Sequence, residues 1–144
     1  MFELTKQKST GYRIILGIII FAFIGFVLRL AFNSPTTTLN EDLISAANQI
    51  NSRCPIIVDS MVRLDRVDAL HGNTFQYNYT FTSKELSEID TNDLKVNWRE
   101  AMLEQTKKNP NTSVFRKNAI VIQAKYVDKN GKYVATMSLL PSEY

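Results

Sequence analysis

The longest apolar stretch of the chain lies near its N-terminus. Residues 14–28 contain no charged side chain, and beyond Arg29 the apolar run continues through Phe32. A helix over residues 14–32 would be about 28 Å long, close to the roughly 30 Å hydrocarbon core of a bilayer. Arg29 can extend its guanidinium to the headgroups from near the helix end. The pattern predicts a transmembrane helix over residues 14–32, which would place membrane lipid around it.

A cleaved signal peptide is the alternative interpretation of this segment, because a basic leader followed by a short apolar run is typical of one. The residues from Leu30 to Pro35 lack the small side chains that a cleavage site needs at two positions. We therefore favour an uncleaved signal anchor. The segment also contains Gly17 and Gly25, and glycine is frequent in membrane helices in general. The alternative is that their spacing allows a second helix to approach closely.

The distribution of basic residues around the span predicts its orientation. Lys6, Lys8 and Arg13 precede the span, whereas no basic residue follows Arg29 until Arg53. The positive-inside rule therefore predicts a cytoplasmic N-terminus, residues 1–13, in a single-pass protein of the inner or plasma membrane. The C-terminal domain would then be periplasmic or extracellular.

Beyond a polar linker, residues 33–38, the pattern becomes that of an α+β domain over residues 39–144. Thr38-Leu39-Asn40-Glu41 matches a capping box and predicts the start of a helix that continues to about Ser52. Its predicted apolar stripe follows helical spacing and consists of Leu39, Leu43, Ile44, Ala47 and Ile50.

Two strands are predicted after Pro55, which closes the helix. Residues 56–70 are rich in β-branched side chains, but their alternation changes parity, so we expect a bulge or break near Arg66, or a short lead-in strand before Asp59. After a turn at residues 71–73, four aromatic side chains alternate with polar ones: Phe75, Tyr77, Tyr79 and Phe81. Because the companion face is polar, the aromatic side chains are expected in the core rather than on a ligand-stacking platform.

A second helix and a hairpin complete the pattern. Residues 91–108 predict an amphipathic helix with Asp90 as its N-cap and Trp98 packed on the aromatic strand, its stripe being Leu94, Trp98, Ala101, Met102 and Gln105. Residues 119–127 and 132–140 predict a hairpin in which Asn130-Gly131 forms a two-residue type I′ turn. The order helix, two strands, helix, two strands favours a four-stranded, mostly antiparallel sheet with both helices on one face.

Composition excludes several classes of function. The first 32 residues carry four basic and one acidic side chain, whereas residues 33–144 carry thirteen of each, and a domain of zero net charge without a basic run gives no support to nucleic-acid binding. Cys54 and His71 are each the only residue of their kind, which leaves little material for nucleophilic catalysis. Neither a metal site nor a cofactor is therefore expected. Cys54 is interpreted as a buried small hydrophobe or, alternatively, as an intermolecular bridge.

Mixed charge is concentrated in residues 59–68, where Asp59, Arg63, Asp65, Arg66 and Asp68 lie. Interleaved arginines and carboxylates are typical of an ion-pair ladder on an open sheet face, and arginine is favoured at protein interfaces. The candidate partner-binding residues are Asp59, Arg63, Asp65 and Arg66. Paired carboxylates are also the groups that acid-base catalysis needs, so a small hydrolase that uses Asp59, Asp65 or Asp68 is the alternative.

Two resemblances add to this interpretation. The run from Asn51 to Asp59, followed by Arg63-Leu64-Asp65 and by residues 72–80, resembles a pattern of small bacterial exported proteins without an assigned function. In that pattern an apolar residue, rather than Cys54, precedes the proline. More distantly, the element order is similar to the pilotins of type II secretion, which implies binding of a secretin segment and no catalytic residues; pilotins are usually lipid-anchored or soluble.

Together these features predict an uncharacterised single-pass membrane protein whose exported domain is a non-enzymatic binding or assembly module of a cell-envelope complex. The open sheet face or an edge strand would receive the partner. The alternatives are the envelope hydrolase and a self-associating structural protein, in which Cys54 or the membrane helix would join two copies.

Overall fold

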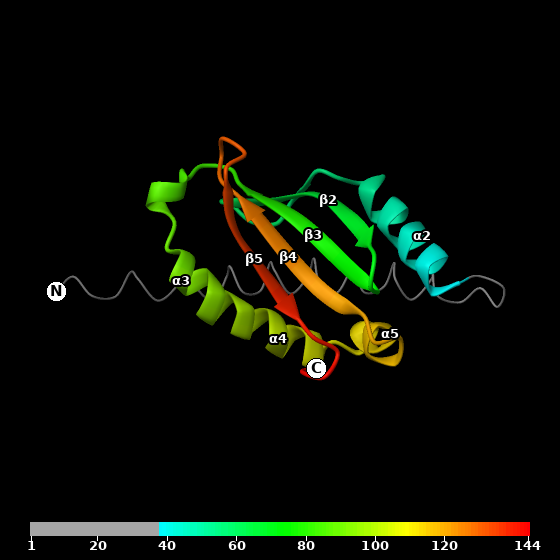
Figure 1. The fold of residues 1–144 in the computed structure, drawn as a ribbon. Coiled ribbons are helices and arrows are strands. Elements are labelled where there is room, and N and C mark those ends of the chain that lie inside the picture. The colour runs from blue at the N-terminus through cyan, green and yellow to red at the C-terminus, as the bar shows by residue number, and fades with distance from the viewer. Residues whose placement is uncertain (1–37) are drawn as a thin grey trace.

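The computed structural model describes residues 38–144, which form an α+β fold of one five-stranded sheet with helices packed against it (Figure 1). The elements in chain order are α2 (Leu39–Asn51), β1 (Ile56–Ile57), β2 (Val62–Leu70), β3 (Thr74–Phe81), the 3₁₀ helix η1 (Leu86–Glu88), α3 (Thr91–Asp93), the π-helix η2 (Leu94–Trp98), α4 (Arg99–Lys108), the 3₁₀ helix η3 (Pro110–Thr112), α5 (Ser113–Lys117), β4 (Val121–Val127) and β5 (Tyr133–Leu139). The anticipated membrane span at residues 14–32 and most of the linker lie outside the described residues. Within residues 38–144, no helix has both the length and the apolar character that a membrane crossing requires.

Helix α2 begins where the capping box predicts. The Thr38 side chain accepts a hydrogen bond from the Glu41 backbone N–H, and the Glu41 carboxylate accepts one from the Thr38 N–H at 2.9 Å. The buried stripe differs from the expected one, because Asp42 and Ala46 are buried whereas Ile44 is 45% exposed. Leu43, Ala46, Ala47 and Ile50 belong to the buried core, whereas Ile44 lies on the exposed side of the helix.

The sheet has five strands, so the expectation of four is wrong. The chain turns at residues 58–61 and splits residues 56–70 into the two-residue strand β1 and the nine-residue strand β2. Both features predicted from the change in alternation are present. A short strand precedes Asp59, and a bulge lies between Leu64 and Arg66 where β2 pairs with β3. The bulge keeps Val62, Leu64 and Val67 on the same buried face.

The strand order is β1-β2-β3-β4-β5, and the central pair, β3 with β4, is parallel whereas the other pairs are antiparallel. Parallel neighbours need a long crossover, which the helical segment from η1 to α5 supplies. This crossover returns the chain to the end of the sheet where β3 begins. The Val121 N–H then donates to the carbonyl oxygen of Asn73 at 2.9 Å.

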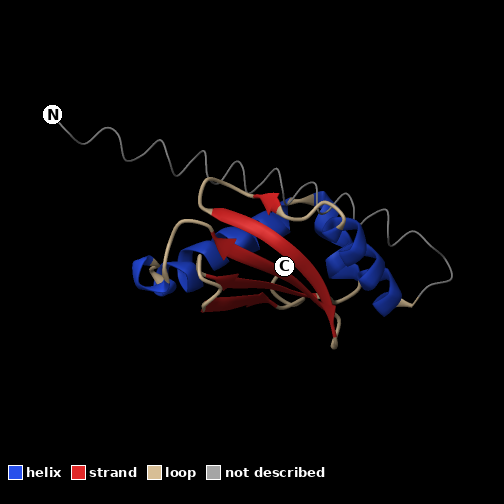
Figure 2. Ribbon diagram, turned by 90° about the horizontal axis from the view of Figure 1, so that it is seen from above, coloured by secondary structure: helices blue, strands red, loops and turns tan. Residues whose placement is uncertain are grey.

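The aromatic residues of β3 form the centre of the core, as the alternation predicts. Phe75, Tyr77, Tyr79 and Phe81 are all buried, and their rings continue into neighbouring elements. Tyr79 stacks on Tyr126 of β4 with ring centroids 5.1 Å apart, and Phe81 lies 5.8 Å from Trp98. The helices therefore cover one face of the sheet (Figure 2). The other face carries the polar side chains of the strands.

The second predicted helix exists over residues 91–108, but it contains a π-helical turn. Asp90 caps it by accepting hydrogen bonds from the Asn92 and Asp93 N–H groups. Residues 94–98 form the π-helix, whose wider turn displaces the later residues from an ideal α-helical stripe. As a result Thr106 is buried, whereas Ala101, expected on the stripe, is exposed.

The hairpin between β4 and β5 is present, but its turn is not the type I′ turn predicted. Gly131 has a φ of +80°, whereas Asn130 lies outside the positive-φ region, and a type I′ turn needs both residues there. The Gly131 N–H donates to the Asp128 carbonyl, and the Asp128 N–H donates to the Lys132 carbonyl. The Asp128 side chain determines this geometry through the bonds described below.

Asn51 joins the end of α2 to the outer edge of β2. Its amide Nδ2 donates to the Val67 carbonyl at 2.8 Å, and its Oδ1 accepts from the Val67 N–H at 2.7 Å. β1 pairs only with Arg63 and Leu64, so it does not extend to Val67. The side chain of Asn51 therefore takes the place of a neighbouring strand immediately after the bulge.

We predict that Asn51→Ala lowers the free energy of unfolding by about 1–3 kcal/mol, because it leaves the N–H and carbonyl of the buried residue Val67 without these partners. Urea unfolding followed by Trp98 fluorescence measures the change. Gln49→Ala, at an exposed position of the same helix, is the control and should change the free energy by less than about 0.5 kcal/mol. An equal, small effect of both substitutions would show that the Asn51 bonds do not hold the helix to the strand.

The buried phenols predict a loss of stability at alkaline pH. Burial raises the pKa of Tyr77, Tyr79 and Tyr126 above the ordinary value of 10.0. Their contribution is fully present below pH 10 and is lost as the pH rises through the folded-state pKa, because the unfolded chain ionises first. Ultraviolet titration should show these phenols ionising together with unfolding, whereas ionisation near pH 10 in the folded protein would contradict the buried positions.

Candidate functional site

The open face of the sheet gathers polar side chains from four neighbouring strands. We define the open face by its polar residues, which are Arg63, Asp65, Arg66, Asp68, Gln76, Asn78, Thr80, Gln123, Lys125, Thr136 and Ser138. They alternate with the buried residues of the core, so the strand pleat that places the aromatics inside also places these side chains outside. Three of the four residues predicted to bind a partner, Arg63, Asp65 and Arg66, belong to this face.

Asp65 organises one half of the β2 side of the open face. The Arg63 Nε donates to Asp65 Oδ1 at 2.5 Å, and the Thr80 hydroxyl donates to Asp65 Oδ2. Arg63 and Asp65 lie on the same strand, so this ion pair joins positions i and i+2 rather than residues of two neighbouring strands. Both oxygens of Asp65 are occupied, and the guanidinium of Arg63 is fixed in direction.

Asp68 organises the other half in the same way. Arg66 Nη2 donates to Asp68 Oδ1, and Asn78 Nδ2 donates to Asp68 Oδ2 at 2.9 Å. Gln76 Nε2 donates in turn to Asn78 Oδ1 at 3.0 Å. The open face therefore carries hydrogen bonds that attach two arginines of β2 to neighbouring aspartates. Networks of this kind present donors in fixed positions, which favours specific recognition over loose electrostatic attraction.

Asp59 does not share this face. It lies in the turn between β1 and β2, where its Oδ1 accepts hydrogen bonds from the Met61 and Val62 N–H groups at 2.6 and 2.8 Å. Asp59 could share a face with Arg63 and Asp65 only on one continuous strand, and the turn at residues 58–61 breaks that continuity. Asp59 therefore shapes the turn rather than the open face.

The residues of the hydrolase alternative do not line a common cavity in the described part of the chain. Asp65 and Asp68 are held by Arg63 and Arg66 on the open face, and Asp59 caps its turn. Two cavities among the described residues, one beside the β4–β5 hairpin and one on the outer side of α2, are lined by other residues. Neither of these two cavities brings two of the carboxylates together.

Cys54 and His71 also lie in separate surroundings. Cys54 is half-buried and packs against the core before β1, where burial, followed by the nearby charge of Asp65, raises the pKa of its thiol. A raised thiol pKa lowers the thiolate fraction and hence the nucleophilicity of the group. His71 is exposed in the turn between β2 and β3. Within residues 38–144, no three His, Cys, Asp or Glu side chains are placed to hold a metal ion.

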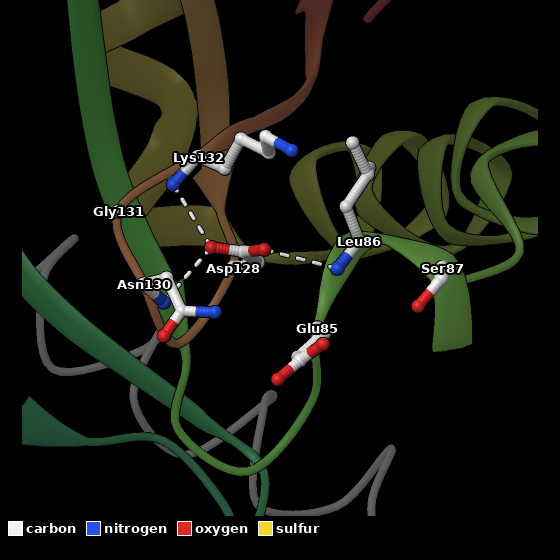
Figure 3. Close-up of a pocket in the computed structure, with 7 residues that line it drawn as sticks. All are labelled: Glu85, Leu86, Ser87, Asp128, Asn130, Gly131 and Lys132. Atoms are coloured by element: carbon white, nitrogen blue, oxygen red, sulfur yellow. Dashed lines mark hydrogen bonds between the residues drawn. The ribbon is translucent and has the colours of Figure 1, made fainter.

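Asp128 is the structural centre of an open cavity of about 530 Å³ between the β4–β5 hairpin and η1 (Figure 3). Its carboxylate accepts three backbone N–H groups, from Asn130 and Lys132 at 2.9 Å and from Leu86 at 3.0 Å. The bond to Leu86 joins the hairpin to a segment 42 residues earlier. This role of Asp128 was not predicted, although Asp at the first position of a turn is its usual local signal.

The charge of Asp128 is stabilised despite its burial. Burial alone would raise the pKa of this carboxyl group, but the N–H donors of Lys132, Asn130 and Leu86 offset that effect, and the pKa lies below its ordinary value. Nearby, Lys129 pairs with Glu85 at 3.0 Å across the same junction. Because all three N–H groups donate to Asp128, its carboxylate stabilises the turn.

Comparison with known protein families identifies the chain. The sequence model of a domain of unknown function, DUF8479, matches residues 38–135. The chain belongs to the DUF8479 family. Among curated proteins, none matches this DUF8479 chain.

A solved structure shares the fold of the DUF8479 domain. The "putative secreted protein (PA3611)" of Pseudomonas aeruginosa superimposes with a TM-score of 0.60 at 13% identity, over 73% of this chain and 91% of that one. At this identity the similarity establishes the fold. The resemblance to pilotins, which rests on element order, stays a prediction.

The region matched to DUF8479 contains the open-face network on β2 and β3 and the hairpin turn at Asp128. It ends within β5, before the C-terminal segment in which Glu143 pairs with Arg99 at 2.6 Å. The two clusters described above therefore lie within the part of the chain that defines the family.

We predict that Asp128→Asn lowers the melting temperature by several degrees at pH 7, because an amide cannot accept all three N–H donors. The lowered pKa of Asp128 contributes stability that is present above the unfolded value of 3.8 and is lost as the pH falls through the folded value. The difference between the two proteins should therefore shrink below about pH 4.

Calorimetry from pH 7 to pH 2.5 measures this difference. Glu100→Gln, at an exposed position of α4, is the matched control for the loss of one carboxylate. A wild-type protein that is no more stable than Asp128→Asn at pH 7 would contradict the proposed role of the turn.

Proposed function

We propose that the protein is a single-pass membrane protein whose exported DUF8479 domain is a non-enzymatic binding module in a cell-envelope complex. The open face of the sheet would receive the partner protein. The observation that carries the proposal is the oriented network on that face, in which Asp65 and Asp68 hold Arg63 and Arg66.

An exported location is supported by two independent observations. The apolar segment at residues 14–32, with its basic leader, has the features of a signal anchor. The Pseudomonas aeruginosa protein that shares the fold is described as secreted. Together they favour a cytoplasmic N-terminus and a domain on the outer side of the inner or plasma membrane.

The hydrogen bonds of the charged groups favour binding over catalysis. On the open face each of the two carboxylates already accepts two side-chain hydrogen bonds, so neither presents an unoccupied oxygen to a substrate. The face is broad and polar, and its arginines retain further N–H donors. Arginines positioned in this way suit bidentate recognition of carboxylates on a protein partner.

The experiment is in-cell crosslinking and mass spectrometry of the tagged full-length protein and of an Arg63→Glu/Asp65→Lys variant. This exchange keeps an opposite-charge pair on β2 but inverts the charge at each position, so the fold is retained while recognition changes. We expect one envelope protein to be recovered at least about tenfold less with the variant, as for the loss of a charged hot spot.

The matched control inverts another ion pair of the domain, by Glu85→Lys and Lys129→Glu, away from the open face. This control should recover the partner at the wild-type level. Equal recovery with the Arg63→Glu/Asp65→Lys variant would show that the open face is not the binding surface. Crosslinks between copies alone would replace the proposal with the self-associating alternative.

A further inference from the structure

The zero net charge of residues 33–144 conceals a separation of charge along the chain. Residues 85–94 contain Glu85, Glu88, Asp90 and Asp93 without a basic residue, whereas residues 105–124 contain Lys107, Lys108, Arg116 and Lys117 without an acidic one. The first group lies on η1 and α3, and the second lies at the end of α4 and on α5. Figure 1 shows these elements at opposite ends of the domain, joined by α4.

The basic end is also the end at which the chain enters the domain. Asn51, at the end of α2, bonds to Val67, and α2 starts beyond the end of β2 (Figure 1). The β2–β3 turn lies at this same end, where Asn73 bonds to Val121 at the start of β4, directly after α5. The first residue of the domain, Thr38, therefore lies at the end that carries α5.

Three basic side chains at this end form no ion pair with another described residue. Lys108 pairs with Glu104 at 2.7 Å, and Glu143 pairs with Arg99, but Lys107, Arg116 and Lys117 form no ion pair there. Arg116 donates to the Thr106 carbonyl at 3.2 Å, which places α5 against the end of α4. Lys107 and Lys117 are exposed. We call Lys107, Arg116 and Lys117 the basic corner.

The acidic side chains near the basic corner are held by groups outside it or are buried. Glu104 and Glu143 act electrostatically on Lys107, but each has its own partner. In the first turn of α2, Asp42 is buried and Glu41 caps the helix. No ion pair among the described residues therefore neutralises Lys107, Arg116 or Lys117.

The tether limits how far this corner can lie from the membrane. If residues 14–32 span the bilayer, only residues 33–37 separate the span from Thr38, and five residues extend at most about 20 Å. A domain held so closely must turn one surface to the lipid headgroups. The end that carries Thr38 is the closest, and it is the basic end.

We propose that the basic corner binds anionic lipid headgroups and so orients the domain with its acidic end, η1 and α3, away from the membrane. This inference rests on the signal anchor of the proposed function. Cations within a Debye length of an anionic bilayer are attracted to it, and the attraction weakens with salt.

The test uses the full-length protein in proteoliposomes, with Cys54→Ala and a single new cysteine for a bimane fluorophore. Ser113→Cys places the label on α5, and Ser87→Cys places it on η1. Lipids with a nitroxide headgroup quench a label that lies at the bilayer surface. In bilayers with about 30% phosphatidylglycerol, we expect quenching at position 113 to exceed that at position 87 at least twofold, and to decline in about 0.5 M salt.

Charge variants identify the residues responsible. Lys107→Gln/Lys117→Gln should reduce quenching at position 113 to the level seen in phosphatidylcholine alone. Lys95→Gln/Lys132→Gln removes the same charge from exposed positions elsewhere and should leave the quenching unchanged. Equal quenching at both labels, or no dependence on the anionic lipid or on Lys107 and Lys117, would overturn the proposal.

Flotation of the same proteoliposomes distinguishes the loss of the headgroup contact from the absence of a membrane anchor. A chain that floats with the lipid but shows no contact at position 113 retains its anchor and refutes only the headgroup contact. A chain that does not float after alkaline extraction has no anchor, which overturns both the proposed location and the orientation inferred from it.

Discussion

The arrangement of the domain follows from the need to bury one continuous row of aromatic side chains on β3. Phe75, Tyr77, Tyr79 and Phe81 lie on a central strand, so they can be removed from water only if helices cover that face of the sheet. The helical crossover between β3 and β4 then has to return on the same side, and Trp98 packs against Phe81 and Tyr126. Because strand side chains alternate, Gln76, Asn78 and Thr80 are forced onto the opposite face. The polar character of the open face is thus a consequence of the core.

The bulge in β2 connects the core to the open face. Without one extra residue between Leu64 and Arg66, Val67 would face water, since a shift of one position exchanges the two faces of a strand. The same extra residue places Asp65 and Arg66 consecutively on the open side, which allows the two ion pairs to form along one strand. Asn51 then satisfies the backbone of Val67, where β1 has already ended. One irregularity in the strand therefore serves both packing and surface chemistry.

Sequence could predict those features that depend on neighbouring residues. The capping box at Thr38, the cap at Asp90 and the buried aromatic alternation are all local, and the structure confirms them. The parallel pairing of β3 with β4, the π-helical turn and the bond from Asp128 to Leu86 depend on residues far apart in the chain, so no local pattern specifies them. The open face was anticipated through Arg63, Asp65 and Arg66, whereas Asp59 was misplaced because a turn, invisible to strand parity, separates it from them.

The two proposed interaction surfaces do not compete, because they differ in direction. The strands of the sheet run between the acidic end and the basic end of the domain, so a membrane at the basic end meets the ends of the strands rather than their sides (Figure 1). In that orientation the sheet stands upright on the bilayer, and Arg63 and Arg66 project sideways from it. A partner anchored in the same membrane could then meet the open face within the plane of the bilayer, where tethering raises the effective concentration of both proteins. Charge separation along the fold would therefore act on binding indirectly, by determining which surface remains accessible.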